Sequence, residues 1–258
     1  MWKAAAFGPA NTRANIRYNG FVPNRAYLSV WSRDFSESTM LAHFESLLAT
    51  VPFSKTRPGF TELIIRAVSY GEPPVVEHDL RQPPLTAAEI AAAAGEILHS
   101  DIAYEVEAHW DLWSPSGERK VWTLGPQRLE ILCQGPDYDD GASLERGHIL
   151  IDVGFEDLFT GDSHLPNAAA DKRLDQADDL DAPPSEAAER EFMQYLAQPG
   201  KLREYQQQAK EKTVDNINRL QEWMRRILTD VQVERVKLWS EGEENFEDRI
   251  DAIQTAGQ

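Results

Sequence analysis

Residues Glu105–Leu112 read EVEAHWDL, and this regular alternation of side chains decides how the chain can fold. A β-strand has a period of two, so it divides the stretch into polar Glu105, Glu107, His109 and Asp111 on one face and apolar Val106, Ala108, Trp110 and Leu112 on the other. One apolar and one polar face are typical of an antiparallel sheet that is covered on one side only. The stretch therefore predicts a strand whose apolar face packs against helices.

Strands and helices are predicted on both sides of this stretch. Two further strands follow at about residues 120–134 and 147–155, and the turn SPSGE makes the first of them an antiparallel hairpin partner of residues 101–113. Strands at 26–32 and 60–68 flank a helix at about 37–51 with apolar residues at helical spacing. A second helix begins at Thr86, because Thr86 and Glu89 have the spacing of a capping box.

The last third of the chain has a different character. Residues 167–184 contain five Asp, no aromatic residue and a terminal Pro-Pro, which is typical of a solvated linker. A long amphipathic helix is predicted at 201–230, then a strand at 233–239 and a helix at about 245–254. We therefore divide the chain into a basic arm (1–25), an α+β domain (26–165), an acidic linker (166–184) and a helical extension (185–258). The predicted fold class is α+β, with an antiparallel or mixed sheet, helices on one face and a ferredoxin-like arrangement as one option.

Charge and composition restrict the partners. The net charge is −17, yet residues 1–33 carry five basic residues and no acidic one, so the rest of the chain sums to −22. We expect the basic arm to lie along the acidic body, or else to bind an acidic partner. An acidic body disfavours nucleic acid and favours a partner protein with a basic surface. No apolar run is long enough to cross a membrane. The single Cys133 and the lack of an apolar leader predict a soluble cytoplasmic protein.

The polar residues of the opening stretch have two interpretations. They are either a solvated or partner-binding face of the sheet, or an acid–base or metal site, for which the catalytic candidates are Glu105, Glu107, His109, Asp111 and Lys120. A divalent metal would need ligands from a neighbouring strand, and the metal candidates are His109, Asp111, His148 and Asp152. Cys133 alternates with apolar residues and is expected to be buried and inert.

One short pattern resembles a known family. Asp111 is followed after the turn by Glu118, Arg119 and Lys120, which loosely resembles the Asp…Glu-x-Lys hairpin of restriction-endonuclease-like nucleases. That resemblance implies two carboxylates that hold Mg²⁺ and a lysine that polarises the attacked group. The pattern covers about ten residues, Glu118 falls within the turn, and no basic surface for DNA follows.

Tryptophans and the long helix indicate a docking surface. The residues expected to contact a partner are Trp113, Trp223, Trp239, Ile217, Leu220 and Met224. The other interpretation is that these residues cover the joint between the sheet and the C-terminal helices. We expect a non-enzymatic interaction protein or accessory subunit without a cofactor, which binds another protein or associates with itself through these helices. The alternative is a divalent-metal-dependent hydrolase or nuclease with its site on residues 105–111.

Overall fold

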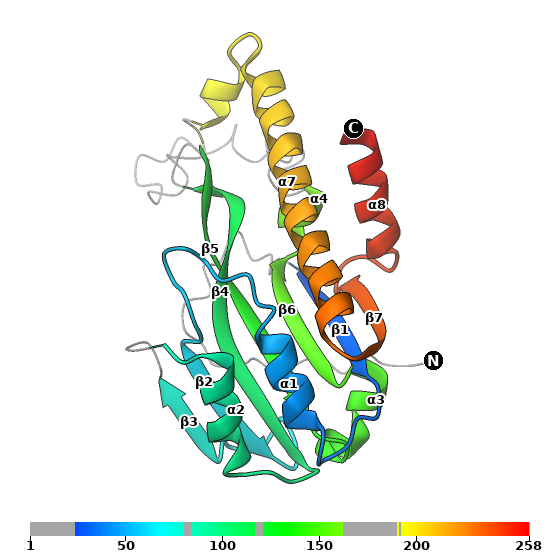
Figure 1. Cartoon of the computed structure of the whole chain (residues 1–258). Helices are drawn as coiled ribbons and strands as arrows, with labels where there is room; N and C mark the ends of the chain where they lie inside the picture. Colours follow the sequence, from blue (N-terminus) through cyan, green and yellow to red (C-terminus); the bar gives the residue numbers. More distant parts are fainter. Residues whose placement is uncertain (1–23, 80–83, 117–120, 162–189, 191, 258) are drawn as a thin grey trace.

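The protein is built on one seven-stranded antiparallel sheet (Figure 1). A computed structural model describes residues 24–79, 84–116, 121–161, 190 and 192–257. The strand order is β3-β2-β4-β5-β6-β1-β7, and each neighbouring pair is antiparallel. The strands are β1 (Arg25–Ser32), β2 (Glu62–Ala67), β3 (Val76–Asp79), β4 (Ile102–Ser116), β5 (Val121–Gln134), β6 (Ile149–Phe155) and β7 (Val233–Ser240).

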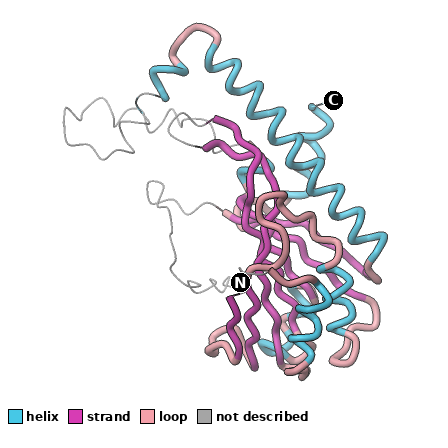
Figure 2. Tube along the Cα trace, turned by 60° about the vertical axis from the view of Figure 1, so that its left-hand side comes forward, coloured by secondary structure: helices cyan, strands magenta, loops and turns pink. Residues whose placement is uncertain are grey.

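Helices cover one face of this sheet, as Figure 2 shows from the side. The longer ones are α1 (Met40–Leu48), α2 (Ala87–Gly95), α7 (Lys201–Asp230) and α8 (Phe246–Gly257). Single turns are η1 (Tyr138–Gly141), α3 (Ser143–Arg146) and α4 (Asp157–Thr160). No described helix has both the length and the apolarity needed to cross a membrane. The α+β class, the antiparallel sheet and the one-sided helical cover are therefore confirmed.

The alternation in the opening stretch is what forms the core. Val106, Ala108, Trp110 and Leu112 are all buried on the helix-covered face and belong to one large apolar cluster. Burial of apolar area at about 25 cal/mol per Å² is the main driving force for this packing. The predicted capping box is also present, because the side chain of Thr86 accepts the Glu89 N–H and the Glu89 carboxylate accepts the Thr86 N–H.

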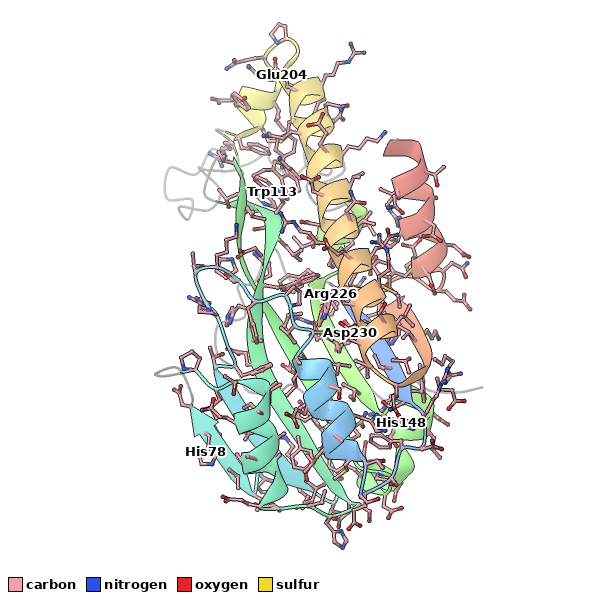
Figure 3. All side chains as sticks on the ribbon, viewed as in Figure 1. His78, Trp113, His148, Glu204, Arg226 and Asp230 are labelled. Carbon is pink, nitrogen blue, oxygen red and sulfur yellow. The ribbon has the colours of Figure 1, made fainter. Side chains whose placement is uncertain are left out.

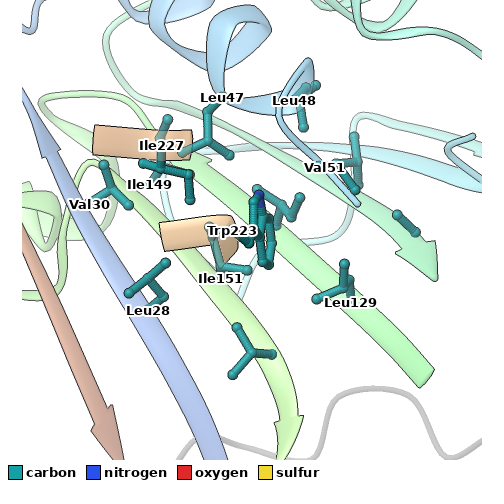
Figure 4. Close-up of a cluster of buried hydrophobic side chains, with 14 of the residues drawn as sticks. Leu28, Val30, Leu47, Leu48, Val51, Leu129, Ile149, Ile151, Trp223 and Ile227 are labelled. Carbon is teal, nitrogen blue, oxygen red and sulfur yellow. The ribbon is translucent and has the colours of Figure 1, made fainter. Parts of the chain in front are cut away.

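The C-terminal third is part of this core and not a separate extension. β7 pairs with β1, and α7 places Ile217, Leu220 and Trp223 in the same cluster as the strands. Figure 4 shows Trp223 and Ile227 of α7 among side chains of β1, α1, β5 and β6. The Trp223 indole N–H also donates to the Thr50 hydroxyl at 3.0 Å, just after α1. Ile217, Leu220 and Trp223 are therefore unavailable to a partner, and of the two interpretations they fit the one in which they cover the joint between the sheet and the C-terminal helices.

Other expectations fare differently. The bounds of α7 agree with the predicted 201–230, whereas α1 begins at Met40 instead of residue 37. β3 was not predicted, because its four residues follow a Pro-rich passage. The first six elements follow the β-α-β-β-α-β order of a ferredoxin-like fold, but β4, β5 and β6 separate β1 from β2, so the strand order is a different one. The linker at 166–184 and all but the last two residues of the basic arm lie outside the described residues.

Candidate functional site on the polar face of the sheet

Carboxylates lie directly opposite one another across four neighbouring strands. Glu62 of β2 is paired with Glu107 of β4, Glu107 with Glu130 of β5, and Glu130 with Asp152 of β6. We call these four residues the carboxylate row. Neighbouring strands are ~4.8 Å apart, and like charges directly opposite each other destabilise a sheet. The row must therefore be compensated by cations or by protons.

Arginines supply part of this compensation. Arg128 binds Glu107 through Nε at 2.8 Å and Glu130 through Nη2 at 2.9 Å. Arg25 of β1 pairs with Asp152 through its Nε. The Thr61 hydroxyl donates to Glu107 Oε1 at 2.9 Å. These arginines were not predicted as partners, although Arg128 lies two positions before Glu130 and therefore shares its face.

Glu105 is a buried carboxylate on this face, and its Oε2 has no hydrogen-bond partner. It is only 8% exposed, and its nearest cation is the Arg66 Nε of β2, at 3.8 Å from Glu105 Oε2. Burial, reinforced by the charge of Glu130, raises the pKa of Glu105 to about 7. Burial also raises the pKa of Glu130 and of Asp152. The face can therefore exchange a proton near neutral pH, which is a property shared by acid–base sites and by buried ion-pair networks.

The metal candidates are not brought together. His109 Nε2 lies 3.2 Å from Nη1 of Arg57, and Asp111 accepts the Lys55 N–H at 3.1 Å. Asp152 belongs to β6, which is two strands away from β4, at ~10 Å across the sheet. Metal ligands must all lie within ~2.5 Å of one ion. His109 and Asp152 are therefore too far apart to share one.

His148 lies at another end of the molecule. Its carbonyl accepts the N–H of Gln134, six residues along β5 from the partner of His109, which corresponds to ~20 Å. Its ring stacks on Phe35 at a centroid distance of 4.0 Å. Figure 3 shows His148 near the end opposite to Trp113. Among the residues that the structure describes, no group of three or more His, Cys, Asp or Glu side chains could hold a metal ion.

Of the remaining catalytic candidates, the structure describes Glu107 and not Lys120. Glu118 and Lys120, which carried the resemblance to nucleases, lie outside the described residues. Cys133 is fully buried, and burial raises the pKa of its thiol far above neutral pH, as an inert cysteine requires. Glu107, the last candidate, is held by Arg128 and Thr61.

The tryptophans outside the core have different surroundings. Trp239 of β7 stacks on Tyr27 at a centroid distance of 4.6 Å, and its indole N–H donates to the Ser29 hydroxyl. Trp113 of β4 lies under the Lys212 ammonium group at 3.6 Å from the ring centroid. Met224 is partly buried against the main core. Of the predicted partner-binding residues, Trp113 is the one that lies on the β4–β5 hairpin.

The β4–β5 hairpin extends well beyond the rest of the sheet (Figure 1). β2 pairs with β4 only up to Glu107, and β6 pairs with β5 only from Glu130 onward. We call the hairpin residues beyond these points, 108–116 and 121–129, the projecting arm. Asn216 of α7 holds this arm, because its side chain binds both the N–H and the carbonyl of Trp113 at 2.8 Å.

A second, smaller apolar cluster joins the projecting arm to the start of α7. It consists of Trp122, Phe192, Leu196, Tyr205 and Ala209, with Trp113 packed against it. Apolar residues also remain exposed on these elements: Val121 (56%), Leu124 (42%), Tyr195 (42%) and Leu202 (43%). Sequence reasoning missed them, although VWTL at the start of a strand after a polar turn offers a signal.

Comparisons with protein-family models, with curated proteins and with solved structures find no match to this chain.

Proposed function

We propose that this chain is a non-enzymatic binding protein that docks on another protein through the projecting arm. The observation that carries the proposal is the exposure of Val121 and Leu124 on a hairpin that α7 holds in place through Asn216. Exposed apolar side chains on a rigid support are typical of interface anchors. Trp113, which is paired with Leu124 across the hairpin, is of the residue type most enriched in such anchors, and Val121 lies on the opposite face of the same hairpin.

Charge supports a basic partner. The chain carries a net charge of −17, so a partner with a basic surface is attracted over a distance of about one Debye length, ~8 Å at physiological salt. Complementary charge mainly accelerates association and selects the partner, while buried apolar contacts slow dissociation. We therefore propose that the acidic body orients the approaching partner and accelerates its association, and that the projecting arm provides the affinity.

The chain's own polar face supports this choice over a hydrolase. Three members of the carboxylate row are tied to arginines, and in the described part of the chain His109, Asp111, His148 and Asp152 do not converge on one metal ion. A metal-dependent hydrolase needs such side chains to converge on one ion. We accordingly propose the binding function and not the alternative.

The experiment is an affinity capture with matched variants. Removal of residues 167–258 would take α7 and β7 out of the core, so point substitutions are required. The test variant is Val121→Asp with Leu124→Asp. The control is Val75→Asp, because Val75 is also 56% exposed but lies before β3, away from the projecting arm.

We expect wild type and Val75→Asp to retain one stoichiometric basic protein that the double variant loses. The association rate of that protein should fall as salt is raised from 50 to 500 mM. Identical captured proteins for all three forms would overturn the proposal. A wild-type dimer that the double variant converts to a monomer in light scattering would replace it with self-association.

A further inference from the structure

At one end of the polar face, two loops meet beside Glu105. The turn that follows β2 contacts η1 through a hydrogen bond from the Asp139 N–H to the Val68 carbonyl, at 2.9 Å. The Val68 N–H in turn donates to the Asp101 carbonyl at 2.8 Å, just before β4. The β2 turn and the η1 loop are thereby fastened to each other and to the sheet.

Backbone strain is concentrated at this junction. Val68, Asp139 and Asp140 have φ values of 68°, 51° and 56°, in the left-handed region. A β-branched residue such as Val68 rarely adopts this conformation. Strained backbone persists only where the surrounding contacts hold it in place. The β2 turn therefore depends on its contacts with the sheet and can change when they change.

Three buried polar atoms at the same place lack a hydrogen-bond partner. They are Nε of Arg66, Oε2 of Glu105 and the hydroxyl oxygen of Tyr138. The gap of 3.8 Å between Arg66 Nε and Glu105 Oε2 is too long for a hydrogen bond but within the range of an ion pair. A shift of ~1 Å would close it to the ~2.8 Å of a charge-assisted bond.

Arg66 connects Glu105 to the β2 turn. Its Nη1 donates to the Glu72 carbonyl at 3.2 Å, and its guanidinium lies over the Tyr70 ring at 5.2 Å. The guanidinium thus faces two acceptors through different nitrogens, because Nη1 binds the neutral carbonyl in the turn and Nε faces the Glu105 carboxyl group. The guanidinium is rigid, so a move of ~1 Å that brings Nε onto the carboxyl oxygen also stretches the 3.2 Å bond of Nη1 to the Glu72 carbonyl. Which acceptor it prefers depends on the charge of Glu105, because a carboxylate is a much stronger acceptor than a carbonyl.

Burial favours the neutral form of Glu105. Burial raises its pKa to about 7, and Glu130 and Glu62 add to this effect while Arg66 and Arg128 oppose it. The titratable and charged groups that face Glu105 are Glu62 and Arg66 of β2, Tyr70 of the turn, Glu107 of β4, Arg128 and Glu130 of β5, and Tyr138 and Asp139 of η1.

We propose that Glu105 and Arg66 form a proton-operated latch for the β2 turn. With Glu105 protonated, Arg66 holds the turn through the Glu72 carbonyl. When Glu105 releases its proton to solvent, Arg66 moves to the new carboxylate and the turn loses this contact. The strain at Val68 then favours opening of residues 68–75.

The test is hydrogen exchange of the peptide that covers residues 68–75, with rates corrected for the intrinsic effect of pH. If the open turn restores the ordinary carboxyl pKa to Glu105, the open fraction rises about tenfold between pH 6 and pH 8. Protection in wild type should fall by that factor. Glu105→Gln, which stays neutral, should keep the pH 6 protection at pH 8, and Glu96→Gln on the surface should behave like wild type.

A second variant tests the same contact in case Glu105→Gln does not fold. Arg66→Gln removes the contact with Glu72, so the turn should be poorly protected at both pH values while the peptide of β6 stays protected. Protection of residues 68–75 that is independent of pH in wild type would overturn the latch. The same tenfold fall in Glu105→Gln would overturn it as well.

Discussion

Replacement of Leu220 by Ala tests whether α7 belongs to the core of the sheet. Leu220 is 0% exposed and packs within the main apolar cluster, next to Trp223 on the same helix. The substitution removes three carbon atoms, worth about 2.4 kcal/mol at about 0.8 kcal/mol for each buried methylene-sized group. The cavity that remains adds to this loss, so we expect the free energy of unfolding to fall by about 3 to 4 kcal/mol.

The same helix offers a matched control. Leu228 is 56% exposed, and Leu228→Ala should change the free energy of unfolding by less than about 0.5 kcal/mol. The assay is urea denaturation of wild type and both variants, followed by tryptophan fluorescence and by far-ultraviolet circular dichroism. We expect one cooperative transition in which both signals coincide. A loss below about 1 kcal/mol for Leu220→Ala, or a helical signal that melts separately, would refute the single core.

Three further predictions concern single contacts. Asn216→Ala should lower the free energy of unfolding by about 3 kcal/mol, measured by the same denaturation, because it removes the partner of the part-buried N–H and carbonyl of Trp113 and of the buried Leu158 carbonyl. A loss near zero would mean that water replaces the side chain. Thr86→Ala should cost about 1 kcal/mol through loss of the α2 cap, whereas Thr86→Ser should cost little. The raised pKa of Glu105, about 7 against about 4.3 in the unfolded chain, means that the folded state holds the proton more tightly. This contribution to stability is complete below about pH 4 and is lost as pH rises through 7. The free energy of unfolding of Glu105→Gln should therefore rise by about 2 to 3 kcal/mol relative to that of wild type between pH 5 and pH 8. Parallel curves of stability against pH for the two proteins would contradict this.

Local periodicity was sufficient for most of the elements. The alternation of residues 105–112 identified the apolar face of β4, because a strand allows only two faces. The break QPG at 198–200 predicted about where α7 begins, and the spacing of its apolar residues predicted that it runs toward Asp230. The spacing of Thr86 and Glu89 predicted the start of α2. Each of these signals depends on residues a few positions apart, so it can be recognised before any tertiary contact is known.

Pairings between distant residues were beyond the reach of the sequence. That β7 would pair with β1 was not evident, and without this pairing the sequence left open whether the apolar stripe of α7 meets a partner or covers the joint with the sheet. The order of the strands also decides that Glu62, Glu107, Glu130 and Asp152 form one row, since their spacing along the chain carries no such information.

The polar face of the sheet depends both on local sequence and on contacts between distant residues. The sequence by itself determined that Glu105 and Glu107 would share a face, because their backbone geometry is local. The tertiary structure alone decided that Glu105 would be buried beside Arg66, and burial is what moves its pKa toward neutral. Desolvation and long-range charge depend on everything that surrounds a group in space, and the fold sets these surroundings.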